Sequence, residues 1–256
     1  MERLNQPTKK GLGKHQVLLW GILFLLAGVL GRCILQNKVL QMGSLTSQQL
    51  LEAMSASNTM AAATAALVMQ ALETCAIPVF AFLLVDGYEK YRSRKTMLLY
   101  LVIAAAVSEI PYNYAMYGQL LHMTSRNPAF AMVIGMAVLY FFNRYREKSF
   151  ANVLVKIFVA MAAVLWAVML NVDHGAALLV VTITMWALRG KKHFLTLFGG
   201  AAASACVLFS PFYIVSAMGI FPVHLCREEE TEDPRLLPYL IYPILLCAAA
   251  LLSIFI

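Results

Sequence analysis

The sequence predicts an all-α protein built from membrane-spanning helices. Hydrophobic residues make up 61% of its 256 residues and charged residues only 13%, whereas an ordinary globular domain has roughly 45–50% and about 25%. No water-soluble core could hide so much apolar surface, but lipid accommodates long uncharged runs. Because these runs are too long for membrane strands and do not alternate, we expect helices in a single polytopic domain.

The N-terminal region predicts a signal anchor followed by a polar connector. A basic cytoplasmic tail, residues 1–15, precedes an apolar run that continues to Leu35. This run is longer than the apolar region of a cleavable signal peptide, so an uncleaved span is expected at 17–35. The outer connector after it, at 36–58, is rich in Gln and Ser.

Seven further apolar runs predict the rest of the bundle, which gives about eight spans. Glu73 and Pro78 interrupt the second span and predict a tilted or kinked helix there. Two of the runs, 128–142 and 175–188, are shorter than the ~17 residues needed to cross hydrocarbon upright, so each borrows flanking residues or stops partway. The spans expected after the first are 59–85, 96–114, 128–142, 151–170, 175–188, 194–211 and 236–256.

The basic residues predict the orientation of the bundle, with both termini in the cytoplasm. This orientation puts 15 of the 20 Lys and Arg residues on the cytoplasmic side and the other five outside, in agreement with the positive-inside rule. The net charge of +7 is then explained without a nucleic-acid partner. The five basic residues expected outside are Arg32, Lys38, Arg126, Arg227 and Arg235.

Five scattered cysteines give neither a zinc pattern nor a disulfide framework. No metal centre is therefore predicted. In the expected topology Cys33 and Cys226 both lie near the outer surface, where they could pair.

Glu109 is the first candidate for a functional side chain, because ionisable groups inside spans are expensive. Pro111 follows it by two residues and should bend or end the third span, freeing backbone carbonyls beside the carboxylate. An acidic residue on a bent helix is typical of a cavity wall. The alternative is a structural carboxylate that bonds a Ser or Asn of a neighbouring helix.

Asp173 and His174 form the second candidate, directly before the run at 175–188. Asp173 is expected to cap this helix, with His174 in its first turn. The positive end of the helix dipole disfavours an imidazolium, so His174 would stay neutral and could act as a general base. The alternative is an interfacial histidine beside a simple helix cap.

Other polar residues are candidates for binding. Glu73 lies deep in the second span, and Asn113 and Asn127 lie near the outer ends of spans, so these three are predicted to contact substrate. Basic residues in a cytoplasmic loop are candidates for the phosphates of a coenzyme, although positive-inside bias also explains them. These are Arg92, Arg94 and Lys95. Phosphate-binding and zinc-peptidase motifs are absent from the sequence.

Several motifs resemble those of the TraX family of bacterial membrane proteins, over a region from 77 to 256. The most specific are Ile77-Pro78-Val79-Phe80-Ala81-Phe82-Leu83-Leu84-Val85-Asp86-Gly87-Tyr88, Tyr91-Arg92-Ser93-Arg94 and Ser108-Glu109-Ile110-Pro111-Tyr112. Weaker similarities are Asn127 with Gly135, Asn171-Val172-Asp173-His174-Gly175, and Leu237-Pro238-Tyr239-Leu240-Ile241-Tyr242-Pro243.

The resemblance implies an acetyltransferase of the bacterial inner membrane. The family is named for the F-pilin acetylase of conjugative plasmids, so acetyl-CoA would be the donor, approaching from the cytoplasm, and a pilin N-terminus is one acceptor. Glu109 and Asp173 match positions of the family motifs. Combined with the residues above, this predicts that His174 takes a proton from an acceptor amine or hydroxyl, that Glu109 orients or stabilises it, and that Asp173 mainly caps the helix.

Three positions depart from the family pattern. The first span lacks the usual Asp-His pair, Leu245 stands where a histidine is common, and His174 replaces a tyrosine. A non-catalytic component of pilus or envelope assembly is therefore a second hypothesis. A small-solute transporter, with Glu109 and Glu73 on broken helices, is a third.

Overall fold

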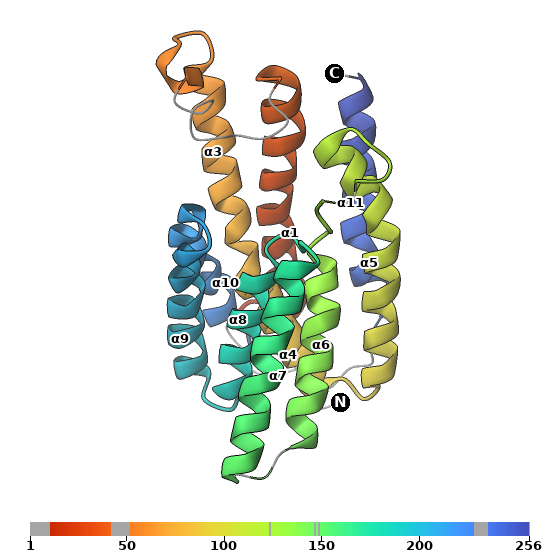
Figure 1. Ribbon diagram of the computed structural model, residues 1–256, viewed down its shortest axis with the longest axis vertical. Helices are drawn as coiled ribbons and strands as arrows, with labels where there is room; N and C mark the ends of the chain where they lie inside the picture. Colours follow the sequence, from red (N-terminus) through yellow and green to blue (C-terminus); the bar gives the residue numbers. More distant parts are fainter. Residues whose placement is uncertain are drawn as a thin grey trace, which may run out of the picture.

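The computed structural model shows a bundle of helices (Figure 1). It describes residues 11–41, 52–122, 124–145, 147, 149–227 and 235–255. Within these residues the chain is helical and forms no strand, and two isolated β-bridges join loop segments. The prediction of an all-α polytopic membrane protein is confirmed.

Five helical segments of the described chain are long and apolar enough to cross a membrane, against the eight spans expected from the sequence. Four shorter apolar segments complete the bundle. The long segments are α1 (Lys14–Leu30) continued by the π-helix η1 (Gly31–Val39), α3 (Met60–Thr74) with α4 (Ala76–Lys90), α5 (Arg94–Tyr117), α7 (Phe150–Met169) and α11 (Leu237–Phe255). The shorter ones are α6 (Ala129–Arg144), α8 (Gly175–Ala187), α9 (Lys192–Ala205) with η2 (Cys206–Leu208), and η3 (Pro211–Gly219) with α10 (Ile220–His224).

The two prolines expected to disturb helices behave differently. The interruption expected in the second span is present, because α3 ends at Thr74 and α4 begins at Ala76. Pro78 lies in the first turn of α4, where a missing N–H is tolerated. By contrast, α5 runs through Pro111 and ends at Tyr117, so of the two expected outcomes, a bend or an end of the helix at this proline, the end is wrong. Buried residues on both sides of Pro111 keep this part of α5 packed.

The first span and its connector also differ from the prediction. Helical structure continues beyond residue 35 to Val39, into the segment expected as a polar connector. Part of that connector, 42–51, lies outside the described residues. The long helices α1, α3, α5 and α11 reach further toward one end of the molecule than α6 to α10 do (Figure 1).

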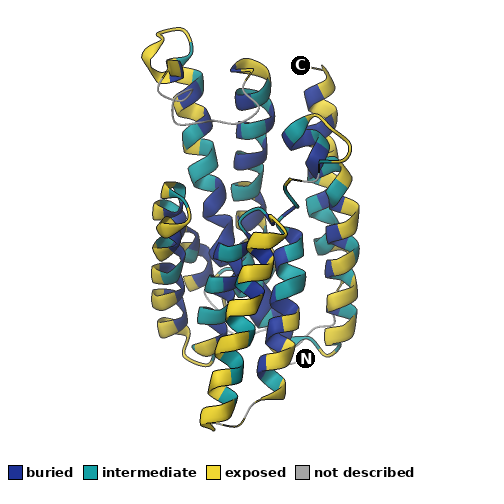
Figure 2. Cartoon of the chain, viewed as in Figure 1, coloured by how far each residue is buried: buried dark blue, intermediate teal, exposed yellow. Residues whose placement is uncertain are grey.

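Burial follows the expected pattern of a membrane bundle. Buried residues gather in the interior of the bundle, while the outward faces are exposed (Figure 2). Only 11% of the most apolar stretch of α7 is buried inside the protein. An apolar helix with so little burial is suited to face lipid.

The expectation that both termini lie on one side is wrong for this structure. Lys14 at the start of α1 pairs with Asp86 near the end of α4, at 2.7 Å. The rings of Tyr100 and Tyr239 touch near the starts of α5 and α11, which therefore begin at one end of the bundle and run side by side (Figure 1). Because α5 follows directly after the end of α4, the helices α1, α5 and α11 all begin at the same end of the bundle. The last residues of α11 therefore lie at the opposite end from Lys14.

The segment before α11 explains this difference. Residues expected to form an outer loop instead form η3 and α10, which bring the chain back to the end where α1 begins. There the backbone N–H of Arg227 donates to the carbonyl of Leu12, and the N–H of Leu12 donates to the carbonyl of Leu225, both at 2.8 Å. Arg227 and Arg235 therefore lie at the end where α1 begins, together with Lys14, and not at the opposite end as expected. Their true position increases the excess of positive charge at the end where α1 begins.

The cysteine pair considered from the sequence cannot form. Cys33 lies against the carbonyl of Ala249 near the end of α11, whereas Cys226 lies next to Leu12 at the other end of the bundle. All five cysteines are free.

Candidate functional site

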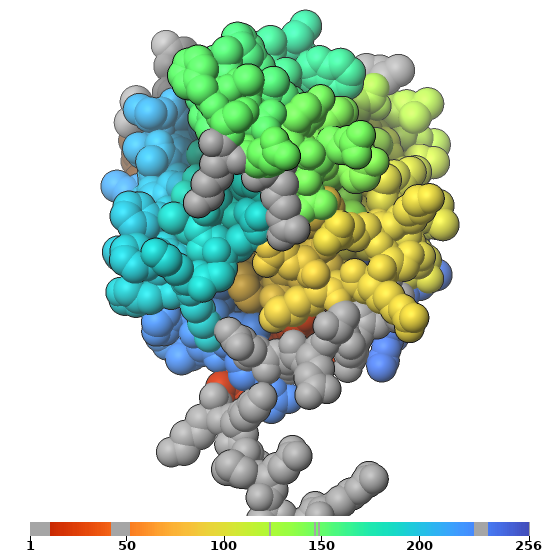
Figure 3. Space-filling model, turned by 90° about the horizontal axis from the view of Figure 1, so that it is seen from below, coloured from red at the N-terminus to blue at the C-terminus, as the bar shows by residue number. Residues whose placement is uncertain are grey.

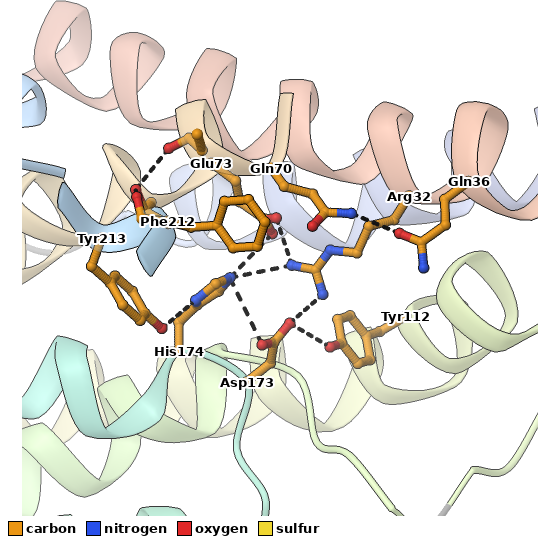
Figure 4. Close-up of polar contacts among 11 residues, drawn as sticks. Arg32, Gln36, Gln70, Glu73, Tyr112, Asp173, His174, Phe212 and Tyr213 are labelled. Atoms are coloured by element: carbon orange, nitrogen blue, oxygen red, sulfur yellow. Dashed lines mark hydrogen bonds and ion pairs between the residues drawn. The ribbon is translucent and has the colours of Figure 1, made fainter. Parts of the chain in front are cut away.

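A network of charged side chains lies inside the bundle, with Arg32 at its centre (Figure 4). Glu73 is buried, and Arg32, Asp173 and His174 are partly buried. Its guanidinium donates to Asp173 Oδ2 at 2.7 Å and to Glu73 Oε2 at 2.5 Å. The Nη2 atom of Arg32 also lies 3.2 Å from Nε2 of His174. Tyr112 donates from its hydroxyl to Asp173 Oδ2 at 2.9 Å, and the hydroxyl of Tyr213 lies 2.7 Å from His174 Nδ1.

Two local features of the helices bring Arg32 and Glu73 together. Arg32 lies on the π-helix η1, a rare form that often occurs at functional sites. Glu73 lies in the last turn of α3, where α1 approaches closely at Gly28. A Cβ atom at Gly28 would overlap the Glu73 carboxyl group, so this approach requires glycine.

Asp173 and His174 lie on a tight turn between α7 and α8. His174 occupies the N-cap position of α8 with a left-handed backbone, φ 55°, and Asp173 precedes it. The prediction that Asp173 caps this helix is wrong, because its carboxylate binds Arg32 and Tyr112. Charge-assisted bonds to a guanidinium are stronger than neutral ones, which accounts for this choice of partner.

The hydrogen bonds indicate which nitrogen of His174 carries the proton. A guanidinium only donates, so a hydrogen bond from Arg32 to His174 requires the tautomer with no hydrogen on Nε2. Nδ1 then carries the hydrogen and donates it to the hydroxyl of Tyr213. The second oxygens of the two carboxylates, Glu73 Oε1 and Asp173 Oδ1, each lie 3.7 Å from Nε2. The two carboxylates and the one guanidinium around the imidazole carry a net charge of −1, which favours the acceptance of a proton by His174.

The same residues have the composition of a metal site. Glu73, Asp173 and His174 each place one ligand atom within 4.8 Å of the others. However, Arg32 binds both carboxylates and approaches the imidazole. Arg32 therefore supplies the positive charge that a metal ion would bring, and the arrangement is a buried ion-pair network.

His174 lines two cavities. The first, of about 180 Å³, has mainly apolar walls and extends from the end of the bundle where α1 begins to Glu73 and His174. Figure 3 shows this end of the molecule, surrounded by the α6–α7 hairpin (green), α8 and α9 (cyan) and α5 (yellow). The lining residues at this end include Lys14, Asp86 and Arg235.

The second cavity, of about 340 Å³, lies between α7, the start of α8 and η3. Asp173, His174 and Tyr213 line it together with Thr124 and Asn171. His174 lines both cavities, so a molecule bound in either one would lie beside this residue.

The structure brings together only part of the residue set predicted from the sequence. Glu73, Asp173 and His174 meet in one network. Glu109 instead binds Arg126 at 3.0 Å and Asn127 at 2.7 Å.

The other predicted binding residues are spread over the molecule. Asn113 is buried, and its side-chain amide has no hydrogen-bond partner in the described structure. Arg92, Arg94 and Lys95 are exposed at the end where the first cavity begins, but they do not line it. Arg94 donates to the carbonyl of Tyr88 and lies over its ring.

Three residues of the network were not predicted as site residues. Arg32 could have been predicted from the sequence, because a charged residue inside an apolar run is a candidate functional group. Tyr112 and Tyr213 could not, since a single tyrosine in an apolar segment is common. Their roles depend on contacts between segments far apart in the sequence.

Comparison with known proteins identifies the family and leaves the activity open. Neither the curated proteins nor the solved structures include a match to this chain. The family model described as "TraX protein" matches residues 39–253. The match covers Glu73, Asp173 and His174 and begins after Arg32. Since it spans most of the chain, this helical membrane protein belongs to the TraX family.

Proposed function

We propose that this protein is a membrane acetyltransferase in which His174 is the general base. The observation that carries the proposal is the position of His174 in the lining of two cavities, with its Nε2 3.2 Å from Nη2 of Arg32. One cavity would admit the acetyl donor and the other the acceptor. The donor is acetyl-CoA, as the family resemblance suggests, and the acceptor is an amine or a hydroxyl, for which a pilin N-terminus is one candidate.

The transfer step assigns roles to three members of the network, His174, Arg32 and Tyr213. The acceptor nitrogen or oxygen attacks the thioester carbonyl carbon, its proton moves to Nε2 of His174, and the carbon–sulfur bond breaks to release the thiolate. The acceptor would take the place beside Nε2 that Nη2 of Arg32 now occupies. Arg32 would then stabilise the negative charge on the carbonyl oxygen, while Tyr213 holds the imidazole through Nδ1.

The two ends of the bundle favour different substrates. The first cavity begins at the end where most basic residues lie, which the positive-inside rule places in the cytoplasm of a bacterial inner membrane. We assign the donor to this cavity, with its phosphates near Arg92, Arg94 and Lys95. The acceptor then enters the second cavity, where Asp173 and Tyr213 line the way to His174.

Transfer of a labelled acetyl group tests this proposal. Purified protein in lipid is incubated with labelled acetyl-CoA and a membrane extract as acceptor. We expect labelling with wild-type protein and its loss in His174→Ala, with correct folding verified for the variant. Folded wild-type protein that transfers no label contradicts the proposal. Purification of a bound partner would then favour an assembly component, and uptake into proteoliposomes that is lost in Glu109→Gln would favour a transporter.

A further inference from the structure

A second polar cluster lies near the turn that carries His174. The proposed reaction does not use this cluster. Glu109 on α5 accepts from Arg126 Nη1 at 3.0 Å through Oε1. Its Oε2 accepts from the side-chain amide of Asn127 at 2.7 Å and from the backbone N–H of Asn127 at 3.3 Å. Only 13% of the Glu109 side chain and none of Asn127 is exposed. The carboxylate therefore fixes both residues of this loop.

The loop held by Glu109 is bonded to the turn before α8. Arg126 donates its backbone N–H to the carbonyl of Asn171 and accepts from the backbone N–H of Asp173, both at 2.9 Å. These two bonds form an isolated parallel bridge between Arg126 and Val172. A continuous chain of hydrogen bonds thus leads from Glu109 through the main chain of Arg126 to Asp173, next to His174.

The turn needs such support because its backbone is unusual. Asn171 and His174 both have left-handed backbones, with φ of 49° and 55°. Residues other than glycine seldom hold this conformation, and Asn and His do so more often than most. Bonds from neighbouring segments help to fix it here. If the turn relaxed, the imidazole of His174 would no longer face Arg32 and Tyr213.

We infer that Glu109, Arg126 and Asn127 are positioning residues for His174, and that they act through the main-chain bridge to Asp173. The sequence alone suggested that Glu109 orients His174, and the structure gives the route, which passes through Arg126. The catalytic meaning of this inference rests on the proposed function. The positioning itself can be measured without any acetyl transfer.

Nitrogen NMR of the protein in lipid tests the inference directly. The chain has five histidines, so histidine-selective ¹⁵N labelling gives few signals, and the loss of signals in His174→Gln assigns those of His174. In the wild type we expect one set, with Nδ1 protonated and Nε2 unprotonated. In Glu109→Gln we expect the His174 signals to shift or split into a mixture of tautomers.

Two further variants keep the test decisive. Arg126→Met removes the ion pair but keeps the main chain, and it should alter the His174 signals in the same way even if Glu109→Gln does not fold. Glu89→Gln removes a different ion pair, with Arg189, and should leave the signals unchanged. His174 signals that stay at wild-type positions in a folded Glu109 or Arg126 variant would overturn the inference.

The transfer assay separates this inference from the proposed function. If the protein is an acetyltransferase, Glu109→Gln should lower kcat by about 10²-fold, the size expected for a misplaced catalytic group, and leave KM for acetyl-CoA nearly unchanged. A kcat equal to that of the wild type would contradict the inference. If His174 signals respond but no transfer occurs in any sample, the positioning role stands and the acetyltransferase proposal fails.

Discussion

Replacement of Gly28 by alanine tests whether the close approach of α1 to Glu73 maintains the buried network. The new methyl group would overlap the Glu73 carboxyl carbon and Oε2, the oxygen that accepts from Arg32. Since Glu73 is buried, with 4% exposed, its carboxylate has little room to move aside. The variant should therefore break the bond between Glu73 and Arg32.

The size of the effect follows from three contributions. Overpacking of a tight interior costs about 1–3 kcal/mol, and loss of a hydrogen bond between charged groups costs about 1.5–3 kcal/mol. Alanine favours the helix over glycine by about 0.5–1 kcal/mol. We therefore expect Gly28→Ala to lower the free energy of unfolding by about 1.5 to 5.5 kcal/mol.

Gly200 provides a matched control on another helix. A Cβ atom there would lie 3.7 Å from Ile220 Cγ2, an ordinary contact. Gly200→Ala should thus leave stability unchanged or raise it by up to about 1 kcal/mol. Both variants can be measured by unfolding in mixed detergent micelles. A Gly28→Ala protein as stable as Gly200→Ala would refute the idea that this contact holds Glu73 against Arg32.

Two further predictions concern the charges and the topology. Arg32→Gln leaves two carboxylates without their guanidinium and should destabilise the protein by about 3–5 kcal/mol in the same unfolding assay. Adding Glu73→Gln should recover part of this loss, and a double variant no more stable than the single one would contradict the pairing. For the topology, His15→Cys and Phe255→Cys, each in a Cys247→Ser background, should react with a membrane-impermeant thiol reagent from opposite sides of oriented vesicles. Labelling of both from one side would contradict the parallel course of α1 and α11.

The helical, membrane-spanning character could be predicted from composition alone. A long uncharged run is stable in lipid only as a helix, so local sequence determines this part of the fold. The interruption near Glu73 and Pro78 was predictable for the same reason, because proline acts within its own helix. These features do not depend on distant contacts.

The course of the chain could not be predicted in the same way. The segment that forms η3 and α10 returns the chain to the end where α1 begins, and this reverses the direction of α11. Arg227 was placed outside by counting spans, yet the bond from its backbone N–H to the carbonyl of Leu12 decides its position. Because this segment was missed, the direction predicted for the helix after it, α11, was reversed.

The site was predictable where a single residue is unusual for its surroundings. Glu73 and His174 stand out as polar groups in apolar runs, and the structure brings them together. Tyr213 contacts His174 across 39 positions of the chain and could be found only from the fold. The same holds for the bridge at Arg126, which depends on a backbone pairing of two loops.

Acetyl transfer by variants of His174 tests most directly whether the protein is an acetyltransferase with His174 as its general base. Wild-type protein in lipid, His174→Ala and the control His193→Ala, which alters an exposed histidine, are compared with labelled acetyl-CoA and a membrane extract. We predict transfer by the wild type and the control, and its loss in His174→Ala. Full transfer by a folded His174→Ala protein, or none by a folded wild type, would contradict it.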